Sequence, residues 1–135
     1  MIYALDTNII IHYLRGEHKV QQNLTNAVMR YDNLIIPKIV DYEMRRGFRI
    51  FPAPKKKAAY HDLVNEDYCA VIDMNAYSWE CAELVYADLY SKRLTLGEID
   101  ILIAAFCIEN NCTLVTNNVK HFECIEGLTI VDWLT

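Results

Sequence analysis

Glycine is scarce in this sequence, with four residues among 135, and no GxGxxG or P-loop pattern is present that could cradle a phosphate. The five cysteines include no CxxC pair, and no paired Cys/His spacing indicates a zinc site. This odd set is typical of reduced, mostly buried thiols in a cytoplasmic protein. No apolar run approaches the roughly 18 residues that a membrane span requires, and residues 1–6 lack the basic region of a signal peptide.

The length of 135 residues suffices for one domain with a real core, and we expect a single domain over residues 1–135. A hydrophobic content of 53% with 23% charged residues is typical of a soluble globular protein. The net charge of −5 argues against a surface that is basic all round and coats nucleic acid.

Short apolar segments alternate with segments of helical pattern along the chain. We expect strands at residues 2–5, 34–36, 69–72, 113–116 and 128–131. We expect helices at residues 9–14, 18–31, 37–46, 57–67 and 76–92, and a last one from the N-cap Thr95 through residue 108. This alternation is typical of βαβ units, so we predict an α/β fold in which a parallel sheet of about four or five strands is flanked by helices on both faces.

Capping residues mark several of these helix boundaries. Residues 6–8 offer N-cap side chains after the first strand, and Gly16 is expected to end the helix that follows. Thr95 and Glu98 have the spacing of a capping box, which predicts that the late apolar helix begins there.

Three acidic residues lie inside or beside apolar runs: Asp6, Glu43 and Asp100. A carboxylate in such a place is costly unless its charge is compensated, and grouped carboxylates bind hard divalent cations. Mg²⁺ held by carboxylates is a standard route to phosphodiester cleavage, so the sequence indicates a metal-dependent nuclease. Each acid also has a simpler interpretation: Asp6 as a helix cap, Glu43 as an exposed helix residue, and Asp100 as an anion favoured near a helix N-terminus.

The predicted fold gives these acids a place to meet. In parallel sheets, ligands bind beyond the carboxyl ends of the strands, at the point where the strand order reverses. Asp6 ends the first strand, and residues 116–118 end the fourth. Glu43 and Asp100 lie on predicted helices that we expect to begin just after strand ends, so the acids could meet at one rim of the sheet.

Neighbouring polar residues are candidates for auxiliary roles. The hydroxyl of Thr7 could hold a carboxylate or phosphate oxygen, and Asn8 is an alternative cap that would free Asp6 for a metal. Thr116 and Asn118 are expected to position a ligand oxygen or a phosphate. The remaining acids of interest are expected to be solvated or to cap helices, with a role at the metal rim left open for the last of them: Asp41, Asp73, Asp88 and Glu98.

More than half of the 13 basic residues follow one another in a single stretch around Glu43 and beyond it: Lys38, Arg45, Arg46, Arg49, Lys55, Lys56 and Lys57. Such a stretch is either a phosphate-binding surface or a solvated helix face followed by a loop. Its position directly after Glu43 favours the phosphate-binding interpretation.

Taken together, these segments resemble the PIN-domain ribonucleases and, among them, the VapC-type toxins of toxin–antitoxin pairs. The resemblance spans essentially the whole chain. It rests on the order and spacing of its motifs: residues 5–8, residues 37–47 with Glu43, residues 100–105, and residues 114–118 followed by His121, Phe122 and Leu128.

This resemblance implies a PIN fold and an endoribonuclease that depends on Mg²⁺ or Mn²⁺, with Asp6, Glu43 and Asp100 as the metal-binding acids. Family members often carry a fourth acid after the position of Thr116, whereas Asn117, Asn118 and His121 occupy that segment here. Since Mg²⁺ prefers oxygen ligands, His121 either favours Mn²⁺ or contacts phosphate. Transfer RNA is the first expectation for the substrate.

The resemblance also implies an antitoxin partner and a homodimer. Four aromatic residues are typical of a core, or alternatively form a partner groove or dimer surface: Tyr13, Trp79, Tyr86 and Tyr90. A rival interpretation is a catalytically inactive PIN-like binding module, which the missing fourth acid would permit. A haloacid dehalogenase-type phosphatase is disfavoured because position 8 is Asn rather than a second acid.

Overall fold

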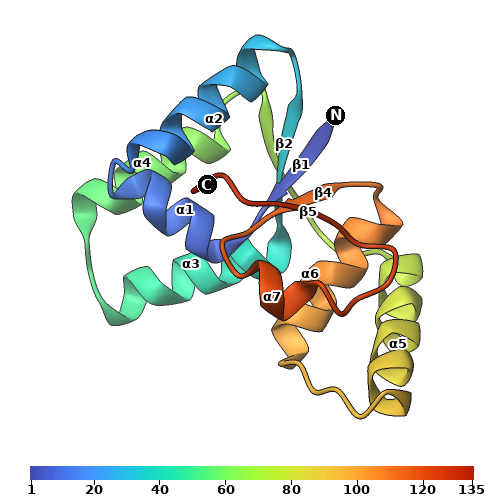
Figure 1. The fold of residues 1–135 in the computed structure, drawn as a ribbon. Helices are drawn as coiled ribbons and strands as arrows, with labels where there is room; N and C mark the ends of the chain where they lie inside the picture. The colour runs from blue at the N-terminus through green and yellow to red at the C-terminus, as the bar shows by residue number, and fades with distance from the viewer.

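Five parallel strands form the centre of the computed structural model, which describes residues 1–135 (Figure 1). The strands are β1 (Ile2–Leu5), β2 (Asn33–Pro37), β3 (Cys69–Ile72), β4 (Thr113–Val115) and β5 (Thr129–Val131). They pair in the order β3-β2-β1-β4-β5, and every neighbouring pair is parallel. The strand predictions are therefore confirmed as elements of a parallel sheet.

Helices cover both faces of this sheet, as predicted. They are α1 (Thr7–Leu14), α2 (His18–Met29), α3 (Lys38–Ile50), α4 (Pro54–Val64), α5 (Ala76–Ser91), α6 (Glu98–Glu109) and α7 (Val119–Phe122). Figure 1 shows α1 to α4 on one side of the sheet and α5 and α6 on the other. None of the helices combines the length and the apolar character needed to cross a membrane.

The strand order reverses at β1. The chain first builds outward from β1 through β2 to β3, then crosses over to add β4 and β5 on the other side of β1. Parallel strands require such crossover connections, and the helices supply them. The carboxyl ends of β1 and β4 therefore form the topological switch point, where α/β proteins bind ligands.

The core lies between the sheet and its two helical layers. In α6 the side chains of Ile103, Ala104, Ala105 and Phe106 have no exposed surface, as the apolar run predicted for a helix that is buried on most sides. All five cysteines are free thiols, and Cys69, Cys107 and Cys112 are buried. The expectation of unpaired, mostly buried thiols is thus confirmed.

The first helix shows which candidate cap is used. Asp6 is the N-cap of α1, and its side chain accepts a hydrogen bond from the backbone N–H of Thr7. The alternative that Asn8 is the cap is wrong, since Asn8 lies within α1. Gly16 follows the C-terminus with φ +81°, a conformation that suits glycine, so its predicted role in ending the helix is confirmed.

Two helix boundaries on the next crossover differ from the prediction. Helix α3 continues through Gly47 to Ile50, because a single glycine costs only about 1 kcal/mol inside a helix and does not by itself end one. Helix α4 begins at Pro54 rather than at Lys57, since proline at the first helical position loses no backbone hydrogen bond.

Three further differences concern the segments after α5 and β4 and the end of β2. The predicted capping box is wrong: Gly97 is the N-cap of α6, no side chain caps this helix, and Thr95 lies outside it. The short helix α7, which carries His121, has no counterpart in the sequence prediction because four residues give no periodic pattern. Pro37, expected in the first turn of α3, is instead the last residue of β2.

Candidate active site

Asp6 lies at the switch point of the sheet. Its backbone N–H donates to the carbonyl of Val115 at 3.0 Å, which extends the pairing of β1 with β4 by one residue. The hydroxyl of Thr116, the residue after β4, donates to Asp6 Oδ2 at 2.8 Å. Both side chains are buried, so the carboxylate is held where two adjacent strands end.

Asn8 links Asp6 to the segment after β4. Its side-chain N–H₂ lies 3.2 Å from Asp6 Oδ2 and 3.3 Å from Thr116 Oγ1, and its side-chain oxygen accepts from the backbone N–H of Asn117 at 3.1 Å. The backbone N–H of Asn118 donates to Thr116 Oγ1 at 3.1 Å. Residues 116–118 therefore support the carboxylate of Asp6, and Asn118 contributes through its backbone.

Glu43 approaches from α3 and is tied to the same place by Thr7. The hydroxyl of Thr7 donates to Glu43 Oε1 at 2.7 Å, while the backbone N–H of Thr7 donates to Asp6. Arg46, one turn further along α3, places a guanidinium nitrogen 4.0 Å from Glu43 Oε2. Thr7 thus touches two of the predicted acids at once.

Asp100 lies in the first turn of α6 and contacts His121 of α7. His121 Nε2 is 2.7 Å from Asp100 Oδ2, a distance at which the imidazole N–H donates to the carboxylate. The ring of Phe122, which is fully buried, packs edge-on against the His121 ring at a centroid distance of 5.5 Å. His121 therefore occupies one oxygen of the third predicted acid.

The electrostatics of Asp6 show that the three acids share one region. Burial raises the pKa of Asp6, hydrogen bonds from Thr116 and Thr7 lower it, and the charges of Asp100 and Glu43 raise it again, with a net upward shift. The repulsion from two carboxylates on separate helices acts on the carboxylate at the end of β1. The structure thus brings Asp6, Glu43 and Asp100 within electrostatic reach of one another.

The donor set suits a hard cation, although it is not a closed cage. No three His, Cys, Asp or Glu side chains stand close enough together to form a ready-made metal site. The three acids nevertheless offer carboxylate oxygens, the ligands that Mg²⁺ and Mn²⁺ prefer. The pKa of Asp6 is raised by burial first and by the two neighbouring carboxylates second, and a cation would offset both effects. Mg²⁺ is also typically held by a few carboxylates with waters filling the remaining positions.

The other sequence candidates divide into two groups. Arg45, Arg46 and Arg49 line one pocket on α3 together with Lys38, close to Glu43. Residues 55–57 lie on α4, which begins near the edge of the molecule in Figure 1, away from the switch point. Glu98 is exposed and lines hollows beside Tyr86 and Ile101, and its role at the metal rim stays a prediction.

The expectation that Asp41 is solvated or caps a helix is wrong. Asp41 is fully buried and accepts hydrogen bonds from Tyr60 Oη at 2.7 Å, Lys38 Nζ at 3.1 Å and Arg45 Nε at 2.9 Å. The helical spacing of Lys38, Asp41 and Arg45 is a signal that could have revealed the ion pairs, since residues three and four apart face one another. Tyr60 belongs to α4 and gives no local signal.

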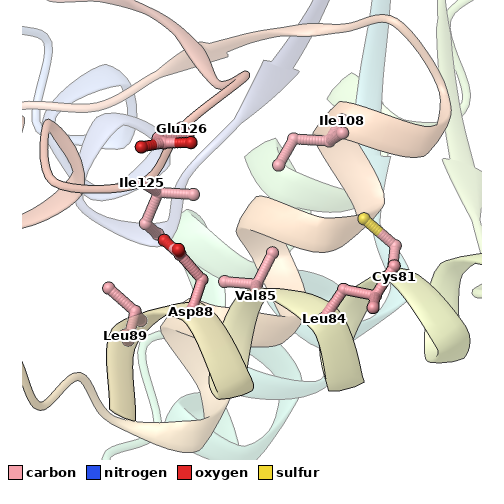
Figure 2. A pocket seen from close by; sticks show the side chains of 8 residues that line it. All are labelled: Cys81, Leu84, Val85, Asp88, Leu89, Ile108, Ile125 and Glu126. Atoms are coloured by element: carbon pink, nitrogen blue, oxygen red, sulfur yellow. The ribbon is translucent and has the colours of Figure 1, made fainter. Parts of the chain in front are cut away.

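The core interpretation of the aromatic residues is also wrong for three of them. Trp79, Tyr86 and Tyr90 on α5 are exposed, whereas Tyr13 is half-buried. A separate apolar hollow of about 280 Å³, which none of these aromatic residues lines, is formed by Leu84, Val85 and Ile108, among others. Figure 2 shows that its lining comes from α5, from Ile108 of α6 and from Ile125 and Glu126, and that none of the three acids takes part.

The family follows from comparison with known proteins. The PIN domain family matches residues 3–126 of the sequence. The chain belongs to the PIN domain family. This match spans most of the chain and includes every residue of the candidate site named above, and it agrees with the parallel α/β fold.

Individual relatives are similar over almost their full lengths. Ribonuclease VapC2 from Rickettsia felis is 29% identical over 136 residues, covering 98% of each chain. The tRNA(fMet)-specific endonuclease VapC from Salmonella typhimurium is 26% identical over 134 residues, covering 97% of each chain. Among solved structures, VapBC2 from Rickettsia felis bound to a promoter DNA fragment contains a chain that superposes with a TM-score of 0.90 at 28% identity, covering 98% of this PIN domain and 99% of that chain.

Proposed function

We propose that this PIN-domain protein is a VapC-type endoribonuclease, the toxin of a toxin–antitoxin pair, and that it cleaves RNA with the help of Mg²⁺ or Mn²⁺. Transfer RNA is the first candidate substrate, because the Salmonella relative carries a tRNA in its name. The location that goes with this function is the cytoplasm, where the free cysteines stay reduced.

The observation that carries the proposal is the position of Asp6. A buried carboxylate stands at the carboxyl end of the central strand, and the charges of Glu43 and Asp100 both act on it. Burying a carboxylate beside two others is unfavourable without a cation, so the arrangement favours the metal-bound state. A carboxylate with a raised pKa at a strand end is typical of a functional site rather than of a structural one.

The residues around the acids fix their geometry before substrate binds. Thr116, Asn8 and the backbone of Thr7 hold the Asp6 carboxylate from different sides, and the Thr7 hydroxyl holds Glu43. His121 holds Asp100. When bound, the cation would lower the pKa of a water and stabilise the charge that develops on the scissile phosphate. Preorganised carboxylates need little rearrangement to place it.

The basic residues on α3 supply contacts for the RNA backbone. Arg46 stands between the pocket on α3 and Glu43, which places positive charge directly beside the acids. Backbone contacts of this kind position a substrate without reading its sequence. Residues 55–57 lie in the first turn of α4, which begins near the edge of the molecule and away from the acids, so we do not assign them this role.

The exposed aromatic face of α5 is our candidate for the antitoxin or for a second copy in a homodimer. Trp79 and Tyr86 line a largely apolar hollow of about 350 Å³ with Leu102 of α6. Exposed apolar patches on a helix are typical of protein–protein contacts. The relatives solved as VapBC complexes support a protein partner.

The test is an RNA-cleavage assay with the purified, partner-free protein. We would incubate total tRNA with it in Mg²⁺, in Mn²⁺ and in EDTA, beside the Asp6→Asn and Asp100→Asn variants. Discrete fragments that require metal and vanish in both variants are the expected result. Full activity of either folded variant would overturn the assignment of the acids.

The second candidate function is a PIN-like binding module without activity. It is favoured by the segment after β4, where His121 contacts Asp100 at the place where relatives often carry a fourth acid. A metal titration by calorimetry distinguishes the two functions. No binding of Mg²⁺ or Mn²⁺ by folded protein, together with no cleavage of tRNA, messenger RNA or ribosomal RNA, would favour the binding module.

A further inference from the structure

A fourth carboxylate, Asp132, lies directly after β5, at the same end of the sheet as Asp6. Strand β5 pairs in parallel with β4, and the backbone N–H of Thr116 donates to the carbonyl of Val131 at 3.0 Å, so the pairing continues one residue past β4. Because parallel strands run in the same direction, residue 132 falls beside residue 117 at this edge. Asp132 is half-buried and makes no direct contact with the three acids.

The carboxylate of Asp132 joins two segments of the chain. Its Oδ2 accepts a hydrogen bond from the side-chain N–H₂ of Asn117 at 3.2 Å, and its Oδ1 accepts from the backbone N–H of Leu134 at 2.9 Å. The second bond closes a turn in which an Asp side chain accepts from the backbone two residues further on. One oxygen is therefore fixed by the turn, and the other is presented to the segment after β4.

The segment that carries Asp132 is anchored to other parts of the fold. The side chain of Trp133 is buried and packs edge-on against Tyr3 of β1, with ring centroids 5.3 Å apart. The side-chain N–H₂ of Asn23 on α2 donates to the carbonyl of Trp133 at 3.0 Å. The residue next to this anchor has little freedom to move, so the carboxylate of Asp132 is a fixed acceptor rather than a mobile surface charge.

Asn117 connects this fixed acceptor to Asp6 through Asn8. The backbone N–H of Asn117 donates to Asn8 Oδ1 at 3.1 Å, and Asn8 Nδ2 donates to Asp6 Oδ2 at 3.2 Å. Only the oxygen of an amide side chain can accept from a backbone N–H, so the bond from Asn117 decides that the N–H₂ end of Asn8 faces the carboxylate. Without that bond, the amide of Asn8 would be free to rotate away from Asp6.

We propose that Asp132 is a positioning residue of the active site, which acts through Asn117 and Asn8 to hold the Asp6 carboxylate in the orientation that binds the divalent cation. This inference rests on the proposed metal-dependent function and adds a residue to its site. Groups that orient a metal ligand contribute to metal affinity without touching the ion. The contribution of Asp132 comes from its role as a hydrogen-bond acceptor, and its charge is not required.

Calorimetric titration of the metal-free protein with Mn²⁺ tests this role. Asp132→Ala is expected to lower the affinity about three- to tenfold, less than the loss of a direct partner of a ligand, because two side chains separate it from Asp6. Asp132→Asn keeps an acceptor for Leu134 and, once the amide of Asn117 flips, a hydrogen bond to residue 117. Its affinity should therefore stay within about twofold of wild type. A loss in Asp132→Asn as large as that in Asp132→Ala would overturn the proposal, since the charge itself would then matter.

Asn23→Ala is the matched control for loosening of residues 132–135. It removes a hydrogen bond of similar length from the same segment and leaves the contact between Asp132 and Asn117 in place. Its Mn²⁺ affinity is expected to stay within about twofold of wild type, even where its Tm falls as far as that of Asp132→Ala. An equal loss of affinity in Asn23→Ala would overturn the proposal, because the effect would then be general destabilisation.

A second readout requires no metal. In the metal-free protein, the NMR signals of the Asn8 side-chain N–H₂ report the orientation of that amide, and they are expected to shift in both Asp132→Ala and Asn117→Ala. The double variant should lose no more Mn²⁺ affinity than the more affected single variant, because both changes break the same series of hydrogen bonds. Additive losses, or unchanged Asn8 signals in Asp132→Ala, would contradict the proposed path.

Failure of this inference is distinguishable from failure of the proposed function. If the wild-type protein binds Mn²⁺ and cleaves RNA, and Asp132→Ala binds Mn²⁺ equally well, the nuclease stands and the positioning role falls. If the wild-type protein neither binds Mn²⁺ nor cleaves RNA, but the Asn8 signals shift in Asp132→Ala and not in Asn23→Ala, the connection from Asp132 to Asn8 stands and the metal-dependent nuclease falls.

Discussion

His121 Nε2 lies 2.7 Å from Asp100 Oδ2, so a residue of the short helix α7 holds a carboxylate of α6. Figure 1 places α7 beside the first half of α6, at the same end of the sheet. The imidazole also packs against buried Phe122, which restricts its movement. His121 therefore fixes Asp100 from outside, in the way that hydrogen-bonded groups around metal sites orient the ligands.

We predict that His121→Leu lowers the affinity for Mg²⁺ or Mn²⁺ about 10- to 100-fold, because Asp100 loses the donor that orients it. His121→Gln keeps an N–H₂ donor in a similar position and is expected to stay within about threefold of wild type. Isothermal titration calorimetry measures both, with Lys120→Gln, an exposed neighbour, as the control. Wild-type affinity in His121→Leu would contradict the positioning role.

A second prediction concerns the stability of Asp6→Asn. Because the folded pKa of Asp6 is raised, its ionisation opposes folding: the contribution is favourable below the unfolded pKa of about 3.9 and is lost as pH rises through the folded pKa. Without metal at pH 7, Asp6→Asn should therefore melt at or above the temperature of wild type. Thermal melts followed by circular dichroism from pH 3 to pH 8 measure this, and the advantage should disappear near pH 3.

Adding metal should make wild type melt at a higher temperature than Asp6→Asn. At a Mg²⁺ concentration 100 times its dissociation constant, binding stabilises wild type by about 2.7 kcal/mol, which corresponds to a rise in Tm of several degrees. Asp6→Asn should gain little. An equal rise in both proteins would show that the ion binds elsewhere.

A third prediction concerns Asp41. Burial raises the pKa of Asp41, but hydrogen bonds from Tyr60, Lys38 and Arg45 outweigh burial and lower it overall. Its charge therefore stabilises the fold above the unfolded pKa of about 3.9, and this contribution is lost as pH falls through the lower folded pKa. Asp41→Asn should reduce the free energy of unfolding by about 2 kcal/mol at pH 7.

Urea denaturation at pH 7 and near pH 3 measures this effect, and the difference from wild type should shrink at the lower pH. Asp62→Asn, an exposed acid on α4, is the matched control and should change little at either pH. A penalty of the same size at both pH values would mean that the charge of Asp41 does not matter.

A fourth prediction separates the two groups of basic residues. Replacing Lys55, Lys56 and Lys57 together by Ala should leave the rate of RNA cleavage within about twofold, since these lysines lie on exposed turns of α4 away from the acids. Arg46→Gln should lower it about tenfold or more, because Arg46 stands beside Glu43 and backbone contacts position the substrate. Single-turnover kinetics on one RNA compare the two, and a larger loss in the lysine variant would place the RNA track along α4.

The placement of Asp6 was predictable because it needs only local information. An acid that directly follows a short apolar strand lies at a strand end, and in a parallel fold that end is where ligands bind. The strand order, however, puts β1 between β2 and β4, and no local pattern gives this order. Only the pairing of β1 with β4 explains why Thr116 donates to Asp6.

Asp41 shows why the rest could not be predicted. Its neighbours in sequence are those of an exposed helical acid, yet Tyr60 from α4 covers it and donates to it. A contact between separate helices depends on how they pack, which the spacing of residues within α3 does not encode. The prediction of where α6 begins was also wrong. Thr95 and Glu98 have the spacing of a capping box, but the N-cap residue is Gly97.

The central place of β1 in the sheet has a consequence for how the protein can be switched off. Asp6 is joined by its backbone to Val115, and β1 is paired on both sides, so we expect its amides to open only when the whole fold does. Local melting of a loop or terminus would leave this carboxylate in place. For the proposed nuclease, we therefore expect reversible inhibition to act by blocking access to the intact site, while the arrangement of the three acids stays unchanged.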